Sequence, residues 1–190
     1  MMAEPAMTAT EMLDRMLEVH GEPAFRYTAA RHLAGILEGR RFGHVVEIGT
    51  QMGLSAAVWA YFADTVTTID ILKYRIRDSV LETAGVTDRV VPVVVCTDAQ
   101  KAHVISRLTF DVAFVDGDHR KLEADGTVFC PAQLDFDLVR RCGSVLFHDY
   151  PHSNPDAPAA SGGAGYVLDT IKPKGAVELF DPSFAWWRAE

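Results

Sequence analysis

The sequence has no apolar run long enough to cross a membrane. A helix needs about 20 consecutive apolar residues to span a bilayer, and no run in these 190 residues approaches that length. The N-terminus, MMAEPAMTATEMLDRMLEVH, mixes acids with apolar residues, so it lacks the basic start and apolar core of a signal peptide. We therefore expect a cytoplasmic protein without a membrane partner.

An excess of positive charge is also missing. The chain has 18 Lys and Arg against 26 Asp and Glu, a net charge of −8. Nucleic acids and anionic lipid surfaces are held mainly by clustered basic residues. This balance argues against a nucleic-acid partner, although it leaves room for a small anionic substrate in a local basic pocket.

Cysteine is scarce and has no paired spacing. The three cysteines are Cys96, Cys130 and Cys142, and no CxxC pair occurs. Structural zinc sites normally need paired ligands at short spacing. We expect reduced thiols packed in or near the core, with neither a zinc site nor a disulfide framework.

Short apolar runs alternate with helical stretches through the middle of the chain. Strands are expected over 44–50, 65–71, 89–96, 110–116 and 143–149, and helices over 53–62, 73–84, about 99–107 and 131–141. Continuous apolar strands separated by helices indicate a parallel sheet covered on both faces, which is a doubly wound α/β fold. Pro92 places the third strand toward the sheet edge, since proline cannot donate to the strand ladder.

Further elements flank this alternating region within a single domain of 1–190. Helices are expected over 9–19 and 23–39, packed at one edge or over the cleft, where they act as a lid or build a dimer. A loop over 156–165 precedes a short helix at 166–172, and the tail AVELFDPSFAWWRAE indicates a hairpin turning at DPS. Trp186 and Trp187 alternate faces on its last strand, so one is expected to pack inward and the other to mark an oligomer contact.

The stretch EIGTQMGLS follows the first strand and carries two glycines. Gly49 and Gly53 allow a sharp turn and a close approach of backbone to ligand. The helix that follows offers free N–H groups to a polar or anionic ligand group. The G-x-x-x-G spacing is neither G-x-G-x-x-G nor GxxxxGK[ST], which argues against nicotinamide cofactors and P-loop nucleotides.

Acids follow the next two strands at the same edge of the sheet. Asp70 lies about 20 residues after the glycine turn, where a carboxylate accepts both ribose hydroxyls; the alternative is that it caps the next turn. Asp98 follows the third strand, where it would hold an adenine amino group or, alternatively, serve as a helix N-cap.

At these residues the sequence resembles class I S-adenosyl-L-methionine-dependent methyltransferases. The resemblance rests on Glu47-Ile48-Gly49-Thr50-Gln51-Met52-Gly53, then Asp70, then Thr97-Asp98-Ala99, and it covers roughly residues 40–190. It implies a Rossmann-like, seven-stranded, mostly parallel sheet with an antiparallel C-terminal hairpin. Helices in residues 1–40 would then precede a cofactor-binding and catalytic core in 41–190.

The resemblance also implies roles for the motif residues. Glu47 would organise the glycine turn, Gly49 and Gly53 would lie under the methionine part, and Ser55 would contact its carboxylate. Asp70 would bind the ribose, Ile71 would pack on adenine and Asp98 would lie at the purine edge. Thr50 and Ala99 complete the expected set of cofactor-binding residues.

A second group of polar residues ends the fourth and fifth strands, in FVDGDH and FHDY. These strands are neighbours in this fold, so Asp116, His119, His148 and Asp149 are expected to converge. Asp, His and Asp side chains form an oxygen-rich site for a divalent cation such as Mg²⁺ or Mn²⁺. His119 is the candidate base near neutral pH. For His148 the sequence leaves three roles open: a metal ligand, a base or a residue that supports the ligands.

The DGDH and HDY motifs are similar to those of small-molecule O-methyltransferases that act on macrolide sugars, cephalosporin nuclei and catechols. In those enzymes an acid after the fourth strand and an acid pair after the fifth hold the metal. Asp116 and Asp149 match this pattern, while His148 replaces an acid. The resemblance implies O-methylation of a small hydroxylated substrate. The alternatives are a methyltransferase that acts on a nitrogen or a macromolecule, and a domain that binds the cofactor without catalysis. The sequence leaves open whether the protein forms a homo-oligomer.

Overall fold

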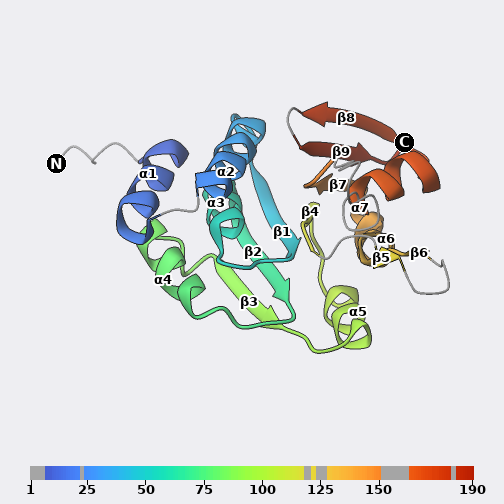
Figure 1. The fold of residues 1–190 in the computed structure, drawn as a ribbon, viewed down its shortest axis with the longest axis horizontal. Helices are drawn as coiled ribbons and strands as arrows, with labels where there is room; N and C mark the ends of the chain where they lie inside the picture. The colour runs from blue at the N-terminus through green and yellow to red at the C-terminus, as the bar shows by residue number, and fades with distance from the viewer. Residues whose placement is uncertain (1–6, 22–23, 118–120, 123–127, 151–162, 181–182) are drawn as a thin grey trace.

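Seven strands form one mixed sheet at the centre of the fold (Figure 1). The computed structural model describes residues 7–21, 24–117, 121–122, 128–150, 163–180 and 183–190, and the structural statements below refer to these. The strand order is β3-β2-β1-β4-β7-β9-β8. The strands are β1 (Phe42–Ile48), β2 (Ala63–Asp70), β3 (Val90–Val94), β4 (Val112–Val115), β7 (Ser144–Phe147), β8 (Ala176–Phe180) and β9 (Phe184–Arg188).

The strand directions confirm the predicted doubly wound, Rossmann-like fold. β3, β2, β1, β4 and β7 run parallel, whereas β9 runs antiparallel to both β7 and β8. β3 lies at one sheet edge, as predicted from Pro92. The DPS segment separates β8 from β9, so the predicted C-terminal hairpin is confirmed as well.

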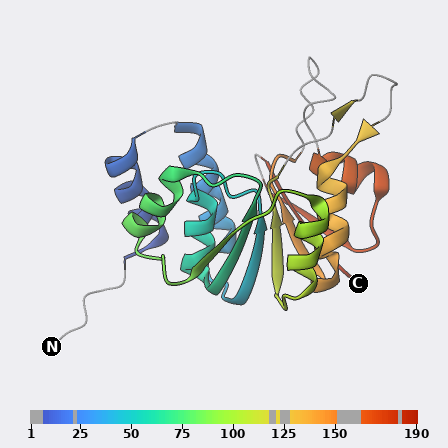
Figure 2. The same cartoon turned by 90° about the horizontal axis from the view of Figure 1, so that it is seen from below.

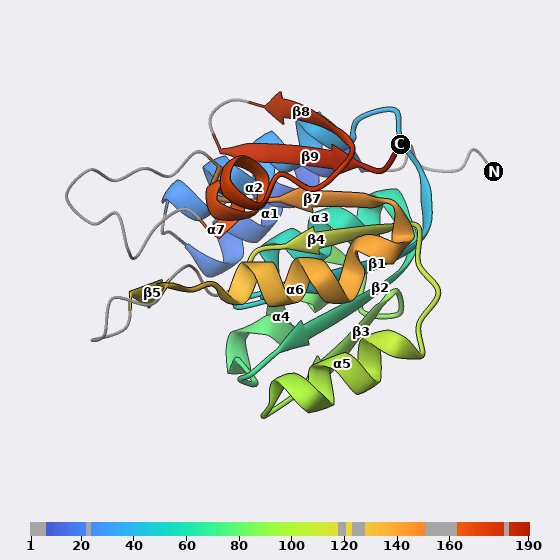
Figure 3. The same cartoon turned by 90° about the vertical axis from the view of Figure 1, so that its right-hand side faces the viewer.

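Helices cover both faces of the sheet (Figure 2). One face carries α1 (Ala9–His20), α2 (Ala24–Leu37), α3 (Leu54–Phe62) and α4 (Arg75–Ala84). The other carries α5 (Asp98–Ser106), α6 (Pro131–Val139), the 3-10 turn Arg140–Cys142, α7 (Gly163–Gly165) and the π-helix η2 (Tyr166–Ile171). Figure 3 shows α5 and α6 across the same face of the sheet. Among the described residues, no helix has the length and apolarity of a membrane span.

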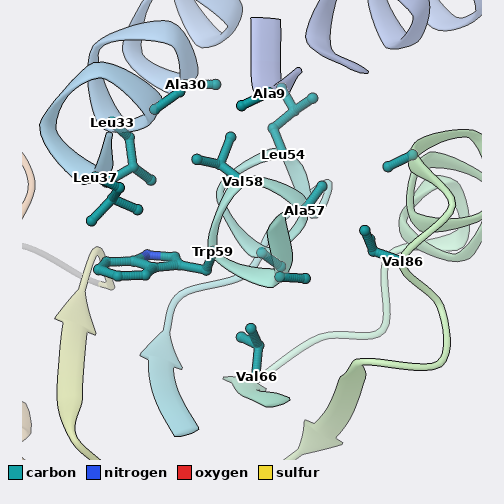
Figure 4. Close-up of a cluster of buried hydrophobic side chains, with 14 of the residues drawn as sticks. Ala9, Ala30, Leu33, Leu37, Leu54, Ala57, Val58, Trp59, Val66 and Val86 are labelled. Atoms are coloured by element: carbon teal, nitrogen blue, oxygen red, sulfur yellow. The ribbon is translucent and has the colours of Figure 1, made fainter. Parts of the chain in front are cut away.

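Each face of the sheet has its own apolar layer. On the first face, Leu33 and Leu37 of α2 lie beside Trp59 of α3 (Figure 4), and the Trp59 ring centroid is 5.8 Å from that of Phe114. On the second face, Phe136 of α6 packs against Trp187 with ring centroids 5.0 Å apart. Successive residues of one strand enter different layers: in β9, Trp186 packs in the first layer and Trp187 in the second.

This arrangement corrects the expectation for the two C-terminal tryptophans. Trp186 and Trp187 are only 2% and 4% exposed, because β9 lies between β7 and β8 and is covered on both faces. The Trp186 indole N–H donates to the Ser144 hydroxyl at 2.8 Å. Neither tryptophan marks an oligomer contact, and an oligomer stays a prediction without this support.

Three smaller expectations also differ from the structure. A second, two-stranded antiparallel sheet, β5 (Lys121–Leu122) with β6 (Val128–Phe129), follows β4 and was not predicted. The cysteines are free thiols as expected, but Cys96 is exposed rather than packed in the core. Of the predicted loop over 156–165, residues 163–165 form α7 and the remainder lies outside the described residues.

The N-terminal helices pack over the first face. α2 contacts α3, whereas α1 contacts α2 and α4. The Thr8 side chain caps α1 in a reciprocal box with Glu11, which fixes where this helix begins. Ala30 and Leu33 of α2 line one cavity together with Gly49, Asp116 and His148, so α2 lies beside the carboxyl ends of the central strands, in agreement with the expected position over the cleft.

Candidate active site

Two cavities open at the carboxyl ends of the parallel strands. The α2-side cavity, about 380 Å³, lies between α2, the glycine turn and the ends of β4 and β7. The α5-side cavity, about 410 Å³, lies between the ends of β2 and β3, α5 and α6. Both are lined by Gly49, Gln51, Asp116 and Gly117, so they meet at the glycine turn. One extended ligand can therefore occupy both.

The glycine turn depends on its two glycines for different reasons. Gly49 has φ +93°, and a Cβ atom there would lie 2.2 Å from the backbone oxygen of Asp116. Gly53 has φ +87°, and its added Cβ would lie 2.9 Å from Cγ of Arg77. Only glycine lets the end of β1 pass this close to the end of β4.

Asp70 holds this turn in place. One carboxylate oxygen accepts from the backbone N–H groups of Thr50 and Gln51, both at 2.9 Å. The other accepts from Leu72 N–H at 3.1 Å, so the alternative role of capping the following turn is observed. Asp70 also lines the α5-side cavity, where a ribose contact stays a prediction.

Glu47 lies beneath the turn in full burial. Neither of its carboxyl oxygens has a partner in hydrogen-bond geometry. The hydroxyls of Ser55 and Thr68 are close enough to lower its pKa, but only in part. Burial is the main cause that raises its pKa from 4.5 to about 8, with smaller contributions from the charges of Asp116 and Asp70. Glu47 is therefore protonated at neutral pH.

This burial gives a testable pH dependence. The folded state binds the Glu47 proton more tightly than the unfolded chain, so wild type loses stability as pH rises from 4.5 to about 8. Glu47→Gln removes the proton but keeps the shape. Its free energy of unfolding should rise relative to wild type by about 1.4 kcal/mol per pH unit in this range. Urea unfolding at several pH values measures this, and a difference that does not change with pH would contradict the protonated state.

The far end of the α5-side cavity contains a buried ion pair that the sequence analysis missed. The Lys101 ammonium lies 2.5 Å from Asp135 and 3.2 Å from Asp98. Burial lowers the Lys101 pKa, but the two acids more than offset this and raise it overall. The i, i+3 spacing of Asp98 and Lys101 was the available signal.

Of the residues expected near the adenine, Asp98 and Ile71 lie at the predicted cavity and Ala99 does not. Thr97, rather than Asp98, is the N-cap of α5, and its hydroxyl accepts from Gln100 N–H at 3.1 Å. Asp98 and Ile71 line the α5-side cavity. Ala99 lines neither of the two cavities and lies in a separate depression beside β3.

Asp116, His148 and Asp149 converge at the ends of β4 and β7, as the strand order requires. Each offers one ligand atom, and these atoms all lie within 4.8 Å of one another. His148 Nδ1 is 2.9 Å from Asp116 and 3.3 Å from Asp149. Burial lowers the His148 pKa, but the hydrogen bond to Asp116 and the two negative charges outweigh it, so the net shift is upward.

The backbone fixes this cluster. Asp116 N–H donates to Ile48 at 2.9 Å, and His148 N–H donates to Val115 at 3.1 Å. Asp149 has φ +61°, a strained conformation for a residue other than glycine. The predicted base His119 lies outside the described residues.

A family model described as a methyltransferase domain matches residues 46–150, more than half of the chain. The chain belongs to this methyltransferase family. The matched region of the methyltransferase contains the glycine turn, Asp70 and the Asp116–His148–Asp149 cluster.

Known structures agree with this fold. An O-methyltransferase from Bacillus cereus, solved with SAH, aligns with a TM-score of 0.67 at 16% identity over 94% of this chain and 90% of its own. The O-methyltransferase TomG of Streptomyces achromogenes, from tomaymycin synthesis and bound to SAM, gives 0.64 at 16% over 99% and 92%. The SAH-bound methyltransferase PaMTH1 of Podospora anserina gives 0.60 at 18% over 98% and 89%. No curated protein sequence matches this methyltransferase.

Proposed function

We propose that the protein transfers a methyl group from S-adenosyl-L-methionine to a hydroxyl of a small molecule. The observation that carries this is the shared wall of the two cavities: the glycine turn and Asp116 line both. A cofactor lying across the turn would present its methyl group beside Asp116, His148 and Asp149. The SAM- and SAH-bound structures of similar fold support this reading.

The adenosine part of the cofactor would occupy the α5-side cavity. There Asp70 would accept from the ribose hydroxyls, Ile71 would pack against adenine, and Asp98 would lie at the purine edge. The methionine part would pass over Gly49 and Gly53 toward Ser55, which lines the α2-side cavity. The first turn of α3 begins there and has free N–H groups for its carboxylate.

The acceptor would lie in the α2-side cavity. Its hydroxyl loses a proton to the cluster, its oxygen attacks the methyl carbon, and the carbon–sulfur bond breaks to leave S-adenosylhomocysteine. The methyl donor is already activated, so alignment of the two reacting atoms contributes most of the remaining catalysis. Cavities of this size suit small ligands, which favours a small hydroxylated acceptor over a macromolecule.

The cluster has two ways to handle the hydroxyl proton. Its two carboxylates and one imidazole fit a divalent cation, and the histidine favours Mn²⁺ over Mg²⁺. A bound cation would supply Lewis acidity that lowers the pKa of the acceptor hydroxyl. Alternatively, Asp116 orients His148 through the 2.9 Å bond, and His148 accepts the proton itself. Asp116 is needed in both cases.

Calorimetry with S-adenosylhomocysteine tests the cofactor assignment. Asp70→Asn weakens both the turn contacts and the proposed ribose contact, so we expect affinity to fall by about 10- to 100-fold. Asp64→Asn is the matched control, because Asp64 lies near the start of the same strand, 68% exposed and paired with Arg41. Unchanged binding in Asp70→Asn would refute the ribose contact. Absence of binding to wild type would refute the proposed function.

A further inference from the structure

The α2-side cavity contains one strongly basic side chain, Arg26 of α2. Arg26 is half-buried and is the sole arginine or lysine among the described residues that line this cavity. The same cavity is lined by Asp116, His148 and Asp149 on the side of β4 and β7. The cavity therefore brings one guanidinium into the space that the acceptor would occupy.

Away from the glycine turn, where Thr50, Gln51 and Ser55 add polar atoms, the wall of the α2-side cavity is mainly apolar. Ala30 and Leu33 of α2 face the cavity together with Phe114 of β4 and Phe184 of β9. Such walls suit the body of an organic acceptor and give little specificity to its polar groups. Arg26 and the Asp116–His148–Asp149 cluster are then the groups that orient the acceptor.

From this arrangement we infer that the methyl acceptor is a hydroxylated carboxylic acid whose carboxylate is bound by Arg26. The inference rests on the proposed function and names its substrate class. A guanidinium binds a carboxylate through two parallel hydrogen bonds, which fixes orientation as well as position. The hydroxyl would then be directed to the cluster while Arg26 holds the opposite end.

The negative charge of the protein disfavours an anionic ligand unless a cation such as Arg26 lies beside it. The chain carries a net charge of −8, and two acids line the same cavity, so the field of the protein opposes an anionic ligand. An acidic acceptor needs a cation at its binding position to overcome this. In the proposed binding mode the cofactor carboxylate lies at Ser55 and the first turn of α3, so the proposal assigns Arg26 to the acceptor rather than to the cofactor.

Matched acceptor pairs test the inference, for example 3,4-dihydroxybenzoate against catechol and 4-hydroxybenzoate against phenol. Wild type should prefer the carboxylated member of a pair. Arg26→Gln should lower kcat/KM for that member by about 10- to 100-fold, mainly through KM, and leave its neutral partner nearly unchanged. Arg26→Lys should retain part of the preference, because it keeps the charge but loses the bidentate geometry.

Arg31→Gln is the control on the same helix, because Arg31 pairs with Asp14 of α1 and does not line the cavity. It should change neither member of a pair. S-adenosylhomocysteine affinity should be equal in wild type and Arg26→Gln; a drop there, with acceptor preference intact, would assign Arg26 to the cofactor and overturn the inference.

The remaining outcomes separate the two claims. Wild type that binds S-adenosylhomocysteine but shows no preference for any carboxylated member, in turnover or in calorimetry of the cofactor-loaded protein, overturns the substrate class and leaves the proposed function intact. Wild type that binds no S-adenosylhomocysteine overturns both.

Discussion

Asp116→Asn is expected to lower kcat for methyl transfer by at least about 100-fold while S-adenosylhomocysteine still binds. Asp116 forms the 2.9 Å contact with His148 and lines both cavities where they meet. Asparagine keeps the size of the side chain but removes its charge. The substitution therefore weakens a cation site and also removes the negative charge that strengthens the bond between residue 116 and His148. Single-turnover methyl transfer and calorimetry measure the two effects separately.

Asp111→Asn provides the control for this prediction. Asp111 precedes β4 at the opposite end from Asp116, and its carboxylate accepts from the N–H groups of Gly43 and His44 at 2.6 and 3.0 Å. Its loss should affect stability without changing kcat. Assays in EDTA, with Mg²⁺ or Mn²⁺ added back, then separate the two roles of the cluster: full activity in EDTA would assign the proton to His148 and exclude the cation. Activity of Asp116→Asn equal to wild type would contradict both roles.

Gly49→Ala is expected to destabilise the protein by about 3 kcal/mol or more and to abolish S-adenosylhomocysteine binding. The added Cβ would lie 2.2 Å from the backbone oxygen of Asp116 and 2.8 Å from Cα of Gly117. Backbone atoms cannot move aside as a flexible side chain can, and Asp116 is held by its bond to Ile48. The added methyl group would therefore push the end of β1 away from the end of β4. Denaturant unfolding measures the loss.

Gly85→Ala separates backbone strain from this clash. Gly85 ends α4 with φ +70°, and an added Cβ there would have no heavy atom within 4 Å. It should cost only the left-handed penalty of about 1 to 2 kcal/mol and leave cofactor binding intact. Equal losses in the two variants would show that the close approach at Gly49 contributes nothing.

The repeated pattern of strands and helices was predictable because it depends on local properties. Continuous apolar strands require a sheet covered on both faces, and the ends of parallel strands gather polar residues at one edge. Pro92 indicated the edge strand, and the DPS segment indicated the hairpin. The convergence of Asp116, His148 and Asp149 was expected because the methyltransferase resemblance implies that the fourth and fifth strands are neighbours.

The features that sequence missed depend on tertiary contacts. Both Trp186 and Trp187 are buried because each face of β9 is covered by its own apolar layer, and alternation along a strand cannot show whether each face is covered. The ion pair of Lys101 with Asp135 joins α5 to α6 over 34 residues of sequence separation. Arg26 reaches the cavity only because α2 packs on α3, which its own sequence does not specify.

Local chemistry could have corrected two other expectations. Thr97 precedes Asp98 and is also among the preferred N-cap residue types, so the choice between them depended on where α5 begins. The segment between β5 and β6 contains Asp125-Gly126, a dipeptide typical of tight hairpin turns. It was a signal for the small second sheet that follows β4.

A crystal structure with bound S-adenosylhomocysteine tests the central claim most directly. We expect the ribose hydroxyls at the Asp70 carboxylate, adenine beside Ile71 in the α5-side cavity, and the sulfur at the glycine turn facing Asp116, His148 and Asp149. A nucleoside bound away from Asp70, or a sulfur directed away from these three residues, would contradict the proposed methyl transfer.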